Sequence, residues 1–148
     1  MILVDANVFV IDLRYPRDAN ATVNKAFLER LAATGQGAVT LFTLLEVAGI
    51  LSFNLNARQL RELVAHFGRR YRVAVCPAPD AGTAVAPGSV DAVLRRMEAR
   101  CALGDALALQ AAEAVALPQT TFVTWDAGHF SGRTSMTVQT PAEWMAEG

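Results

Sequence analysis

The sequence predicts an α/β fold, a single three-layer α/β/α sandwich over residues 1–148 with a central parallel sheet of about five strands. The first observation is that short apolar runs alternate along the chain with longer segments of helical periodicity. The second is that these runs lack the polar–apolar alternation of a half-exposed strand, which indicates strands buried on both faces. Strands of this kind, separated by helices, form parallel sheets with helices on both sides.

The first third of the chain contains two of the expected strands. Ile2–Val4 is a short apolar run without a polar position. Residues 21–33 carry apolar side chains at helical spacing and are followed by Gly35-Gln36-Gly37, which predicts a helix stop and a turn. Residues 38–42 form the second apolar run, and Thr43 can cap the helix that follows it.

The middle of the chain is expected to contain three helices, one strand and a loop. Residues 57–67 form a more polar helix with one apolar face, and residues 71–76 form the third strand. Residues 78–88 contain Gly and Pro among small residues, which is typical of a loop within a domain. Residues 90–100 have helical periodicity, and residues 105–116 form a helix rich in alanine and leucine.

The last part of the chain is expected to complete the sheet. Residues 120–124 form the fourth strand and residues 136–138 a short fifth strand. The sequence Thr140-Pro141-Ala142-Glu143 has the capping-box pattern with proline at the first helical position, so it predicts a final helix.

Composition excludes several classes of protein. With 53% hydrophobic residues the chain is not disordered, and a net charge of −1 excludes binding of nucleic acid by bulk positive charge. Cys76 and Cys101 match neither a disulfide framework nor a zinc motif. We expect a cytoplasmic protein with no membrane segment, because no apolar run approaches the roughly 20 residues of a membrane helix and Asp5 interrupts the first run too early for a signal peptide. Lys25 is the only lysine among 13 basic residues.

Four carboxylates are expected to meet at one edge of the sheet. Asp5 directly follows the first strand, and Asp126 follows the fourth. Glu46 lies in the first turn of the helix that leaves the second strand. Asp105 begins the helix that returns the chain to the start of the fourth strand. Since functional groups of a parallel sheet collect at the carboxyl ends of its strands, these acids from four remote segments converge.

Such a cluster favours a bound metal ion. Like charges at close range raise one another's pKa values, and apolar neighbours add a cost of desolvation. A hard cation removes this conflict, and carboxylate oxygens suit Mg²⁺ or Mn²⁺. The ion can orient water, lower its pKa and neutralise charge on a phosphoryl group. The pattern therefore indicates metal-assisted phosphodiester hydrolysis.

Each acid taken alone has a simpler interpretation. Asp5 or Asn7 can cap the next helix, Asp105 can be an ordinary N-cap, and Asp126 can be a turn residue. Glu46 is the hardest to explain without a partner, because its neighbours are apolar. The joint placement of the four acids at one edge outweighs the separate interpretations.

The acids lie within a set of segments that spans nearly the whole chain. These are Ile2-Leu3-Val4-Asp5-Ala6-Asn7, Thr43-Leu44-Leu45-Glu46-Val47, Gly104-Asp105-Ala106-Leu107-Ala108-Leu109-Gln110-Ala111-Ala112 and Val123-Thr124-Trp125-Asp126-Ala127-Gly128-His129-Phe130, with Thr140-Pro141 near the end. In this order they resemble the PIN-domain ribonucleases, and within them the VapC-type toxins of bacterial and archaeal toxin–antitoxin pairs.

The resemblance implies a PIN-like fold, in which the first strand lies beside the fourth, and a specific activity. By the resemblance, Mg²⁺ or Mn²⁺ would be held by the acidic quartet Asp5, Glu46, Asp105 and Asp126, and the site supported by Asn7 and Thr124. Members of the family are endoribonucleases that cut single-stranded or loop RNA and leave 5′-phosphate and 3′-hydroxyl ends. They are often homodimers, and a small antitoxin protein silences the toxins by inserting into the active-site groove.

The sequence departs from the family pattern at two places. The loop over residues 78–88 is longer than such compact toxins usually carry, and Gln110 stands where the family often has a small or aliphatic residue. Neither place touches the quartet, so the departures bear on substrate choice and on the partner surface.

Several other side chains are expected to have structural roles, and each has a role in binding as the alternative. His129 is expected to serve the turn or the packing, with contact to a metal or phosphate as the alternative, because histidine suits Mg²⁺ poorly. The arginines around Tyr71 and those at residues 95, 96 and 100 are expected on solvated faces, with phosphate contact as the alternative. Trp125 is expected in the core, and stacking on a base is its alternative.

The sequence argues against two other classes of protein with acids at the strand ends, and one non-enzymatic function stays open. A receiver-type signalling domain requires a lysine at the end of a late strand, which Lys25 cannot supply. A haloacid-dehalogenase-type phosphatase requires a second aspartate two residues after the first, and Asn7 stands there instead. The alternative left open is a catalytically weak PIN-like module that acts as a protein- or RNA-binding domain.

Overall fold

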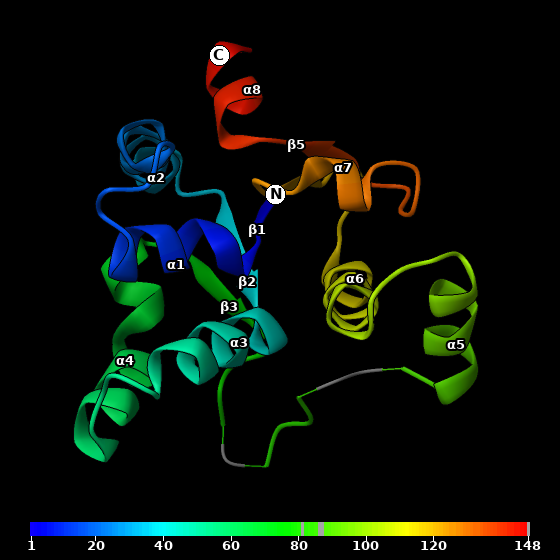
Figure 1. Cartoon of the computed structure of the whole chain (residues 1–148), viewed down its shortest axis with the longest axis horizontal. Helices are drawn as coiled ribbons and strands as arrows, with labels where there is room; N and C mark the ends of the chain where they lie inside the picture. The colour runs from blue at the N-terminus through cyan, green and yellow to red at the C-terminus, as the bar shows by residue number, and fades with distance from the viewer. Residues whose placement is uncertain (81, 86–87, 148) are drawn as a thin grey trace.

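The computed structural model describes residues 1–80, 82–85 and 88–147, and its centre is a five-stranded sheet with the strand order β3-β2-β1-β4-β5 (Figure 1). All neighbouring strands are parallel, which confirms the predicted α/β class. The strands are β1 (Ile2–Val4), β2 (Gly37–Thr40), β3 (Ala74–Cys76), β4 (Thr121–Val123) and β5 (Thr137–Gln139).

Helices cover both faces of the sheet, as the sandwich prediction requires (Figure 1). One face packs against α1, α2, α3 and α4, and the other against α6 and α7, with α5 lying outside α6. The helices are α1 (Ala6–Arg14), α2 (Ala21–Thr34), α3 (Leu41–Leu51), α4 (Ala57–Tyr71), α5 (Val90–Glu98), α6 (Leu103–Val115), α7 (Ala127–Phe130) and α8 (Pro141–Ala146).

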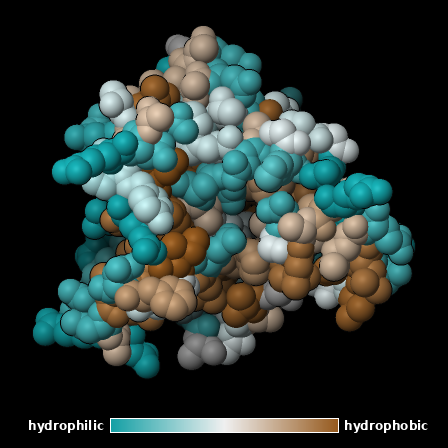
Figure 2. Space-filling view, viewed as in Figure 1, coloured by the Kyte–Doolittle hydropathy of each residue, from teal (hydrophilic) through white to brown (hydrophobic). Residues whose placement is uncertain are grey.

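Helix α5 leaves an apolar stripe in contact with solvent. Val90, Leu94 and Met97 are 77%, 50% and 42% exposed, and their spacing puts them on one side of the helix. Figure 2 shows hydrophobic surface at the right of the molecule, on the side where α5 lies in Figure 1. Among the helices of the described chain, none is long and apolar enough to cross a membrane.

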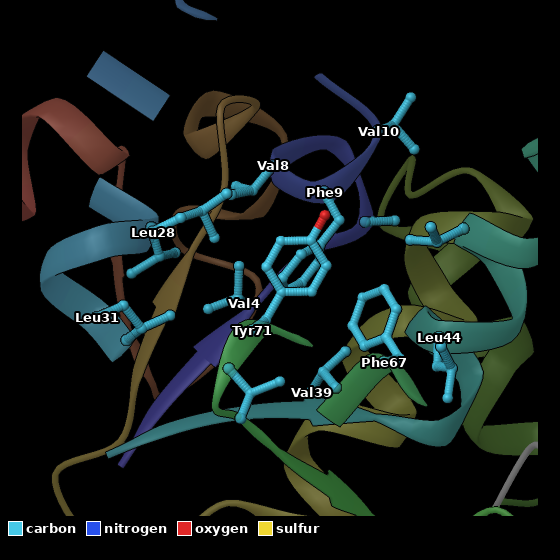
Figure 3. Packing of buried hydrophobic residues seen from close by; sticks show 14 of the residues in the cluster. Val4, Val8, Phe9, Val10, Leu28, Leu31, Val39, Leu44, Phe67 and Tyr71 are labelled. Carbon is cyan, nitrogen blue, oxygen red and sulfur yellow. The ribbon is translucent and has the colours of Figure 1, made fainter. Parts of the chain in front are cut away.

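Strand β1 separates two hydrophobic clusters. Ile2 and Val4 face the larger cluster, whereas Leu3 faces the smaller one under α6, because successive side chains point to opposite faces of a sheet. In the larger cluster the ring centroid of Phe9 lies 4.8 Å from those of both Phe67 and Tyr71, in edge-to-face arrangements (Figure 3). This packing fixes α1 and α4 over the sheet.

The strand order places a crevice at the carboxyl end of β1. After β1 the chain adds β2 and β3 on one side, and it then returns to add β4 and β5 on the other side. The pairing of β1 with β4 matches the position expected for the first and fourth strands. Ligands of open parallel sheets bind where the strand order reverses in this way, so the edge that carries Asp5 is where a site is expected.

The boundary between the second strand and its helix was predicted three residues too late. The structure ends β2 at Thr40, whose hydroxyl oxygen accepts a hydrogen bond from the Thr43 backbone N–H at 3.0 Å, so Thr40 and not Thr43 is the N-cap. Phe42 is therefore helical. Glu46 lies in the second turn of α3 and not in the first. Both threonines can cap a helix, and only the packing of β2 decided between them.

The third strand is shorter than predicted. Helix α4 continues to Tyr71, and the chain turns at Arg72, whose φ of 54° lies in the left-handed region. The strand begins only at Ala74. The apolar side chains of Tyr71 and Val73 suggested a strand, but Tyr71 is buried as the last residue of a helix.

Two helices next to the acids were not predicted. Helix α1 carries four consecutive buried apolar residues from Val8 to Ile11, and such a run has no visible helical period. Helix α7 is a single turn of four residues. The loop predicted over residues 78–88 connects β3 to α5, and its residues 81 and 86–87 lie outside the described part of the chain.

Candidate functional site

All four predicted acids line one pocket at the carboxyl edge of the sheet. The pocket has a volume of about 190 Å³, and Asp5, Glu46, Asp105 and Asp126 contribute to its wall. Apolar side chains of Val10, Ile50 and Phe130 line the same pocket, together with Asn7. The convergence expected from the strand ends is therefore present in the structure.

Each acid comes from a different element. Asp5 is the N-cap of α1 and accepts a hydrogen bond from the Ala6 backbone N–H at 2.8 Å, so capping and a place in the pocket coexist. Asp105 lies in the first turn of α6, and Ala102, not Asp105, is the N-cap there. Asp126 is the N-cap residue of α7 without a side-chain capping bond. A simple capping role thus accounts for Asp5 in part, and for neither Asp105 nor Asp126.

The hydroxyl group of Thr124 links the two acids that flank the β1–β4 pair. It donates a hydrogen bond to Asp5 Oδ2 at 2.7 Å and accepts one from the Asp126 backbone N–H at 3.1 Å. Asn7 Nδ2 donates to the same hydroxyl oxygen at 2.9 Å. Thr124 is fully buried, so its one donor and its lone pairs are all used within the site.

Asn7 completes this network from helix α1. Its Nδ2 also lies 3.2 Å from Asp126 Oδ2, and its Oδ1 accepts a hydrogen bond from the Trp125 backbone N–H at 3.2 Å. The side chains of Asn7 and Thr124 therefore hold the Asp126 segment against α1. The family resemblance predicts a supporting role for Asn7 and Thr124, and these are the hydrogen bonds through which they would act.

Sequence reasoning missed Asn24 as a part of this support. Asn24 is 1% exposed on α2, accepts a hydrogen bond from Trp125 Nε1 at 2.8 Å and donates one to the carbonyl oxygen of Val8 at 2.9 Å. It thereby ties the Trp125–Asp126 segment to helices α1 and α2. Trp125 is partly buried in the larger cluster, as expected for a packing residue. The available signal was a polar residue on the apolar face of the 21–33 helix, between Val23 and Phe27.

The site raises the pKa values of two of its acids. Burial raises the pKa of Asp5 from 3.8 to about 6, against the lowering effect of its hydrogen bonds with Thr124 and Ala6, and the charges of Asp126 and Asp105 raise it further. Burial also raises the pKa of Glu46 from 4.5 to about 7, with added repulsion from Asp5 and Asp105. The cost of crowding like charges in a desolvated pocket is the effect expected from the sequence.

The donor set fits a hard divalent cation that keeps part of its water shell. The pocket offers carboxylate oxygens from four side chains, which is the chemistry that Mg²⁺ and Mn²⁺ prefer. Within residues 1–80, 82–85 and 88–147, no three Asp, Glu, His or Cys side chains are grouped closely enough to enclose an ion as they stand. Mg²⁺ commonly binds through one or two carboxylates and several waters, so an open acidic pocket suits it.

His129 lies next to one of the acids of the pocket. Its Nδ1 is 4.0 Å from Asp105 Oδ2, and its side chain is 68% exposed. The backbone N–H of His129 donates to the Asp126 carbonyl oxygen at 2.8 Å, which is part of the α7 turn. The structure thus shows the expected turn role and also brings the ring close to one acid.

The Glu46→Gln variant is expected to stabilise the metal-free protein above neutral pH. Because the carboxyl group of Glu46 binds its proton more tightly in the folded protein, its stabilising effect is complete below about pH 4.5 and is lost as the pH rises through about 7. A neutral amide avoids that loss. We expect a gain of about 1 kcal/mol near pH 8, a figure reduced for solvent screening of a partly exposed group.

Urea unfolding of both proteins in EDTA, from about pH 4 to about pH 8, measures this gain. The two curves of unfolding free energy against pH are expected to diverge as the pH rises. Parallel curves would contradict the charge crowding at Glu46. The Glu62→Gln variant is the matched control, because Glu62 is exposed on α4 and forms a surface ion pair with Arg58.

The fold and the pocket together define a parallel α/β domain with an acidic site where its strand order reverses. Solved structures with this fold include FitAcB from Neisseria gonorrhoeae, with 19% identity, a TM-score of 0.60 and coverage of 96% of this chain and 99% of that chain. VapBC2 from Rickettsia felis bound to a DNA fragment from its promoter has 18% identity, a TM-score of 0.59 and coverage of 95% and 98%. FitAB bound to an IR36 DNA fragment has 19% identity, a TM-score of 0.58 and 95% coverage of each chain.

At this level of identity the likeness establishes the fold. It confirms the PIN-like fold expected from the sequence resemblance, over nearly the full length of the chain. No family model matches the sequence, and a comparison with curated proteins finds no match either.

Proposed function

We propose that the protein is a metal-dependent endoribonuclease that hydrolyses RNA phosphodiester bonds. The observation that carries this proposal is the meeting of four carboxylates from four remote segments in one partly apolar pocket. The raised pKa values of Asp5 and Glu46 show that this arrangement costs free energy in the absence of a compensating charge. Costly charge clusters of this kind are a feature of functional sites.

The cation would be held by Asp5, Glu46, Asp105 and Asp126. When bound there, Mg²⁺ or Mn²⁺ would activate water and neutralise charge on the phosphoryl group. Thr124 and Asn7 fix the orientation of Asp5 and Asp126 through the hydrogen bonds described above. The apolar side chains in the pocket wall lower the local polarity and so strengthen electrostatic interactions beside them.

We further propose that the protein is the toxin of a toxin–antitoxin pair. This proposal is supported by the fold shared with FitAcB and VapBC2 and by the sequence segments that resemble VapC-type toxins. It implies a small antitoxin partner, and the exposed stripe of Val90, Leu94 and Met97 offers a protein partner an apolar surface. It also implies a homodimer and a location in the cytoplasm, where the two free cysteines stay reduced.

Removal of the metal tests the proposed function directly. The purified protein is expected to cut single-stranded and hairpin RNA in Mg²⁺ or Mn²⁺, to lose this activity in EDTA and to regain it when the cation is restored. The cation should also raise the melting temperature, since a hundredfold excess over the dissociation constant stabilises a protein by about 2.7 kcal/mol. Cleavage that continues in EDTA would contradict the mechanism.

The alternative is a catalytically weak PIN-like module that binds protein or RNA. Under this alternative RNA binding is retained, while no RNA is cut in either cation. The presence of all four carboxylates in one pocket favours the enzyme, because a binding module has no need to crowd charges of the same sign.

A further inference from the structure

A second pocket, of about 530 Å³, lies between helix α5, helix α6 and the turn after α7. Its wall contains three guanidinium groups, those of Arg95, Arg96 and Arg133, and a single carboxylate, that of Glu113. The charge of its lining is therefore opposite to that of the acidic pocket. We name it the arginine pocket.

Arg96 is a fixed part of the wall. Its side chain is 18% exposed and forms an ion pair with Glu113 of α6. It also donates to the Arg133 carbonyl oxygen at 3.2 Å and approaches Gln110 Oε1 at 3.5 Å. Because its charge is balanced by Glu113 and each of its three nitrogens already donates one hydrogen bond, Arg96 shapes the pocket and is less available to an anion than the other two guanidinium groups.

Arg95 and Arg133 are the groups available to a ligand. Arg95 pairs only with Asp91 of its own helix, and both side chains are about 70% exposed, an arrangement that contributes little free energy. Arg133 donates to the carbonyl oxygen of His129. Among the described residues no carboxylate lies within ion-pair distance of Arg133, so the charge of its guanidinium is uncompensated by an ion pair.

Gln110, one of the two departures from the family pattern, lines this pocket, and the end of the long loop lies beside it. Gln110, which replaces a small or aliphatic residue, lines it and contacts Arg96. Gly88, the last residue of the long loop, has a φ of 124° and packs so closely that a Cβ there would lie 2.7 Å from the Gln110 side chain. Gln110 of α6 therefore contacts both Gly88, shortly before the start of α5, and Arg96 within it, and α5 packs against α6.

Helix α6 lines both pockets: Asp105 and Ala108 line the acidic pocket, and Gln110 and Glu113 line the arginine pocket. Near the start of α6 the two pockets are also linked through His129. Arg133 bonds to the backbone of His129, and the ring of His129 lies 4.0 Å from Asp105 Oδ2. The guanidinium group of Arg133 and the carboxylate of Asp105 therefore both lie next to His129. An anion that passes His129 would meet a group from each pocket.

We propose that Arg95 and Arg133 bind a phosphate of single-stranded RNA next to the phosphate that enters the acidic pocket. This inference rests on the proposed function and adds a substrate subsite to it. Guanidinium groups match phosphate oxygens geometrically, and consecutive phosphates of one strand supply the two anionic groups that adjacent pockets require. An acidic peptide is a poorer fit, because its remaining carboxylates would meet the acids beside α7.

Binding of a labelled single-stranded RNA oligonucleotide tests the subsite without requiring cleavage. The double variant Arg95→Ala with Arg133→Ala is compared, in EDTA, with the control double variant Arg58→Ala with Arg61→Ala. The control removes the same charge, and Arg58 has the same kind of exposed i,i+4 pair, with Glu62, as Arg95 has with Asp91. Circular dichroism melting of each variant verifies that it is folded.

The subsite variant is expected to lose RNA affinity about tenfold more than the control. The slope of log affinity against log salt should fall by about 0.7, which is the contribution of one neutralised phosphate of a single strand. Equal losses in the two double variants, or the absence of RNA binding by the unmodified protein, would overturn the inference. Displacement of the bound RNA by a polyglutamate peptide, at the same concentration as the RNA and with the same total charge, would also overturn the inference.

The subsite and the nuclease activity can fail separately. If the unmodified protein binds RNA through Arg95 and Arg133 but cuts none in Mg²⁺ or Mn²⁺, the proposed function is wrong and the subsite stands. If it cuts RNA, a dinucleoside monophosphate offers a further test, because it carries only the phosphate that is cut. The subsite variant should then cut this short substrate as fast as the unmodified protein and longer RNA about tenfold more slowly. Equal slowing on both substrates would overturn the subsite.

Discussion

The Asp5→Asn variant is expected to cut RNA about a thousandfold more slowly than the unmodified protein, which corresponds to a barrier increase of about 4 kcal/mol. The reason is the position of Asp5 in the fold. It lies 7% exposed at the end of β1 and faces Asp105 and Asp126 across the acidic pocket. Its carboxylate is therefore the most deeply placed charge available to a cation, and an amide carries no such charge.

The fold of the Asp5→Asn variant is expected to survive. The amide oxygen can still accept from the Ala6 backbone N–H, and the buried charge that raises the pKa of Asp5 to about 6 is removed. The variant loses the acceptor for the Thr124 hydroxyl, so the two effects on stability oppose each other. Initial rates at saturating Mn²⁺ measure activity, and thermal melting measures stability.

The matched control for Asp5→Asn is Asp80→Asn, which makes the same chemical change at an exposed loop position. We expect this control to retain full activity. Undiminished cleavage by Asp5→Asn would rule out Asp5 as a metal ligand. If Asp5→Asn loses both its activity and its fold, the Glu46→Gln variant tests the proposed metal site instead. This variant is expected to be inactive and, without metal, more stable than the unmodified protein above neutral pH.

The Thr124→Val variant is expected to have the second-largest effect, on activity and on stability together. Removal of the hydroxyl takes a donor from Asp5 and an acceptor from Asn7 and from the Asp126 backbone, although the side chain keeps its size. Loss of a buried hydrogen bond to a charged group costs about 2 kcal/mol. Activity is expected to fall about 10- to 100-fold, as is usual when a group that orients a metal ligand is removed.

Thr124→Ser separates the hydroxyl from the rest of the side chain. It keeps the hydrogen-bonding oxygen and loses one methyl group, so we expect it to retain most of the activity and to cost less in the free energy of unfolding. Urea unfolding and cleavage rates are measured for both variants, and metal titrations followed by thermal melting give their cation affinities. Equal activity in Thr124→Val and in the unmodified protein would show that the network does not position the acids.

The acidic site was largely predictable because its residues sit at the ends of recognisable strands. The apolar runs before Asp5 and Asp126 and the apolar neighbours of Glu46 are visible in the sequence, and the rule for parallel sheets brings them together. Local interpretations were less reliable at boundaries. Both Thr40 and Thr43 are suitable N-cap residues for α3, so the sequence did not distinguish them. Tyr71, the buried last residue of α4, was predicted as the start of a strand.

Asn24 and the arginine pocket could not be located from local patterns. Asn24 contacts Trp125 across 101 positions of sequence, and Arg96 contacts Glu113 through the packing of α5 on α6. Such pairs depend on which helix faces pack together. Helical periodicity predicts the buried face of a helix, but it does not predict which other element packs against that face. The net charge of −1 does not indicate that the protein has two pockets whose linings carry charges of opposite sign.

By itself the sequence determined the parallel α/β class, the order of the strands along the chain and the identity of four acids at their carboxyl ends. These follow from periodicity, capping and residue type, which act over a few neighbouring positions. The family resemblance named Asn7 and Thr124, and only the tertiary structure decided which hydrogen bonds they make with those acids. The bond from Thr124 to Asp5 spans 119 positions and exists because β1 and β4 pair in one register, and that register is set by burial on both faces of the sheet.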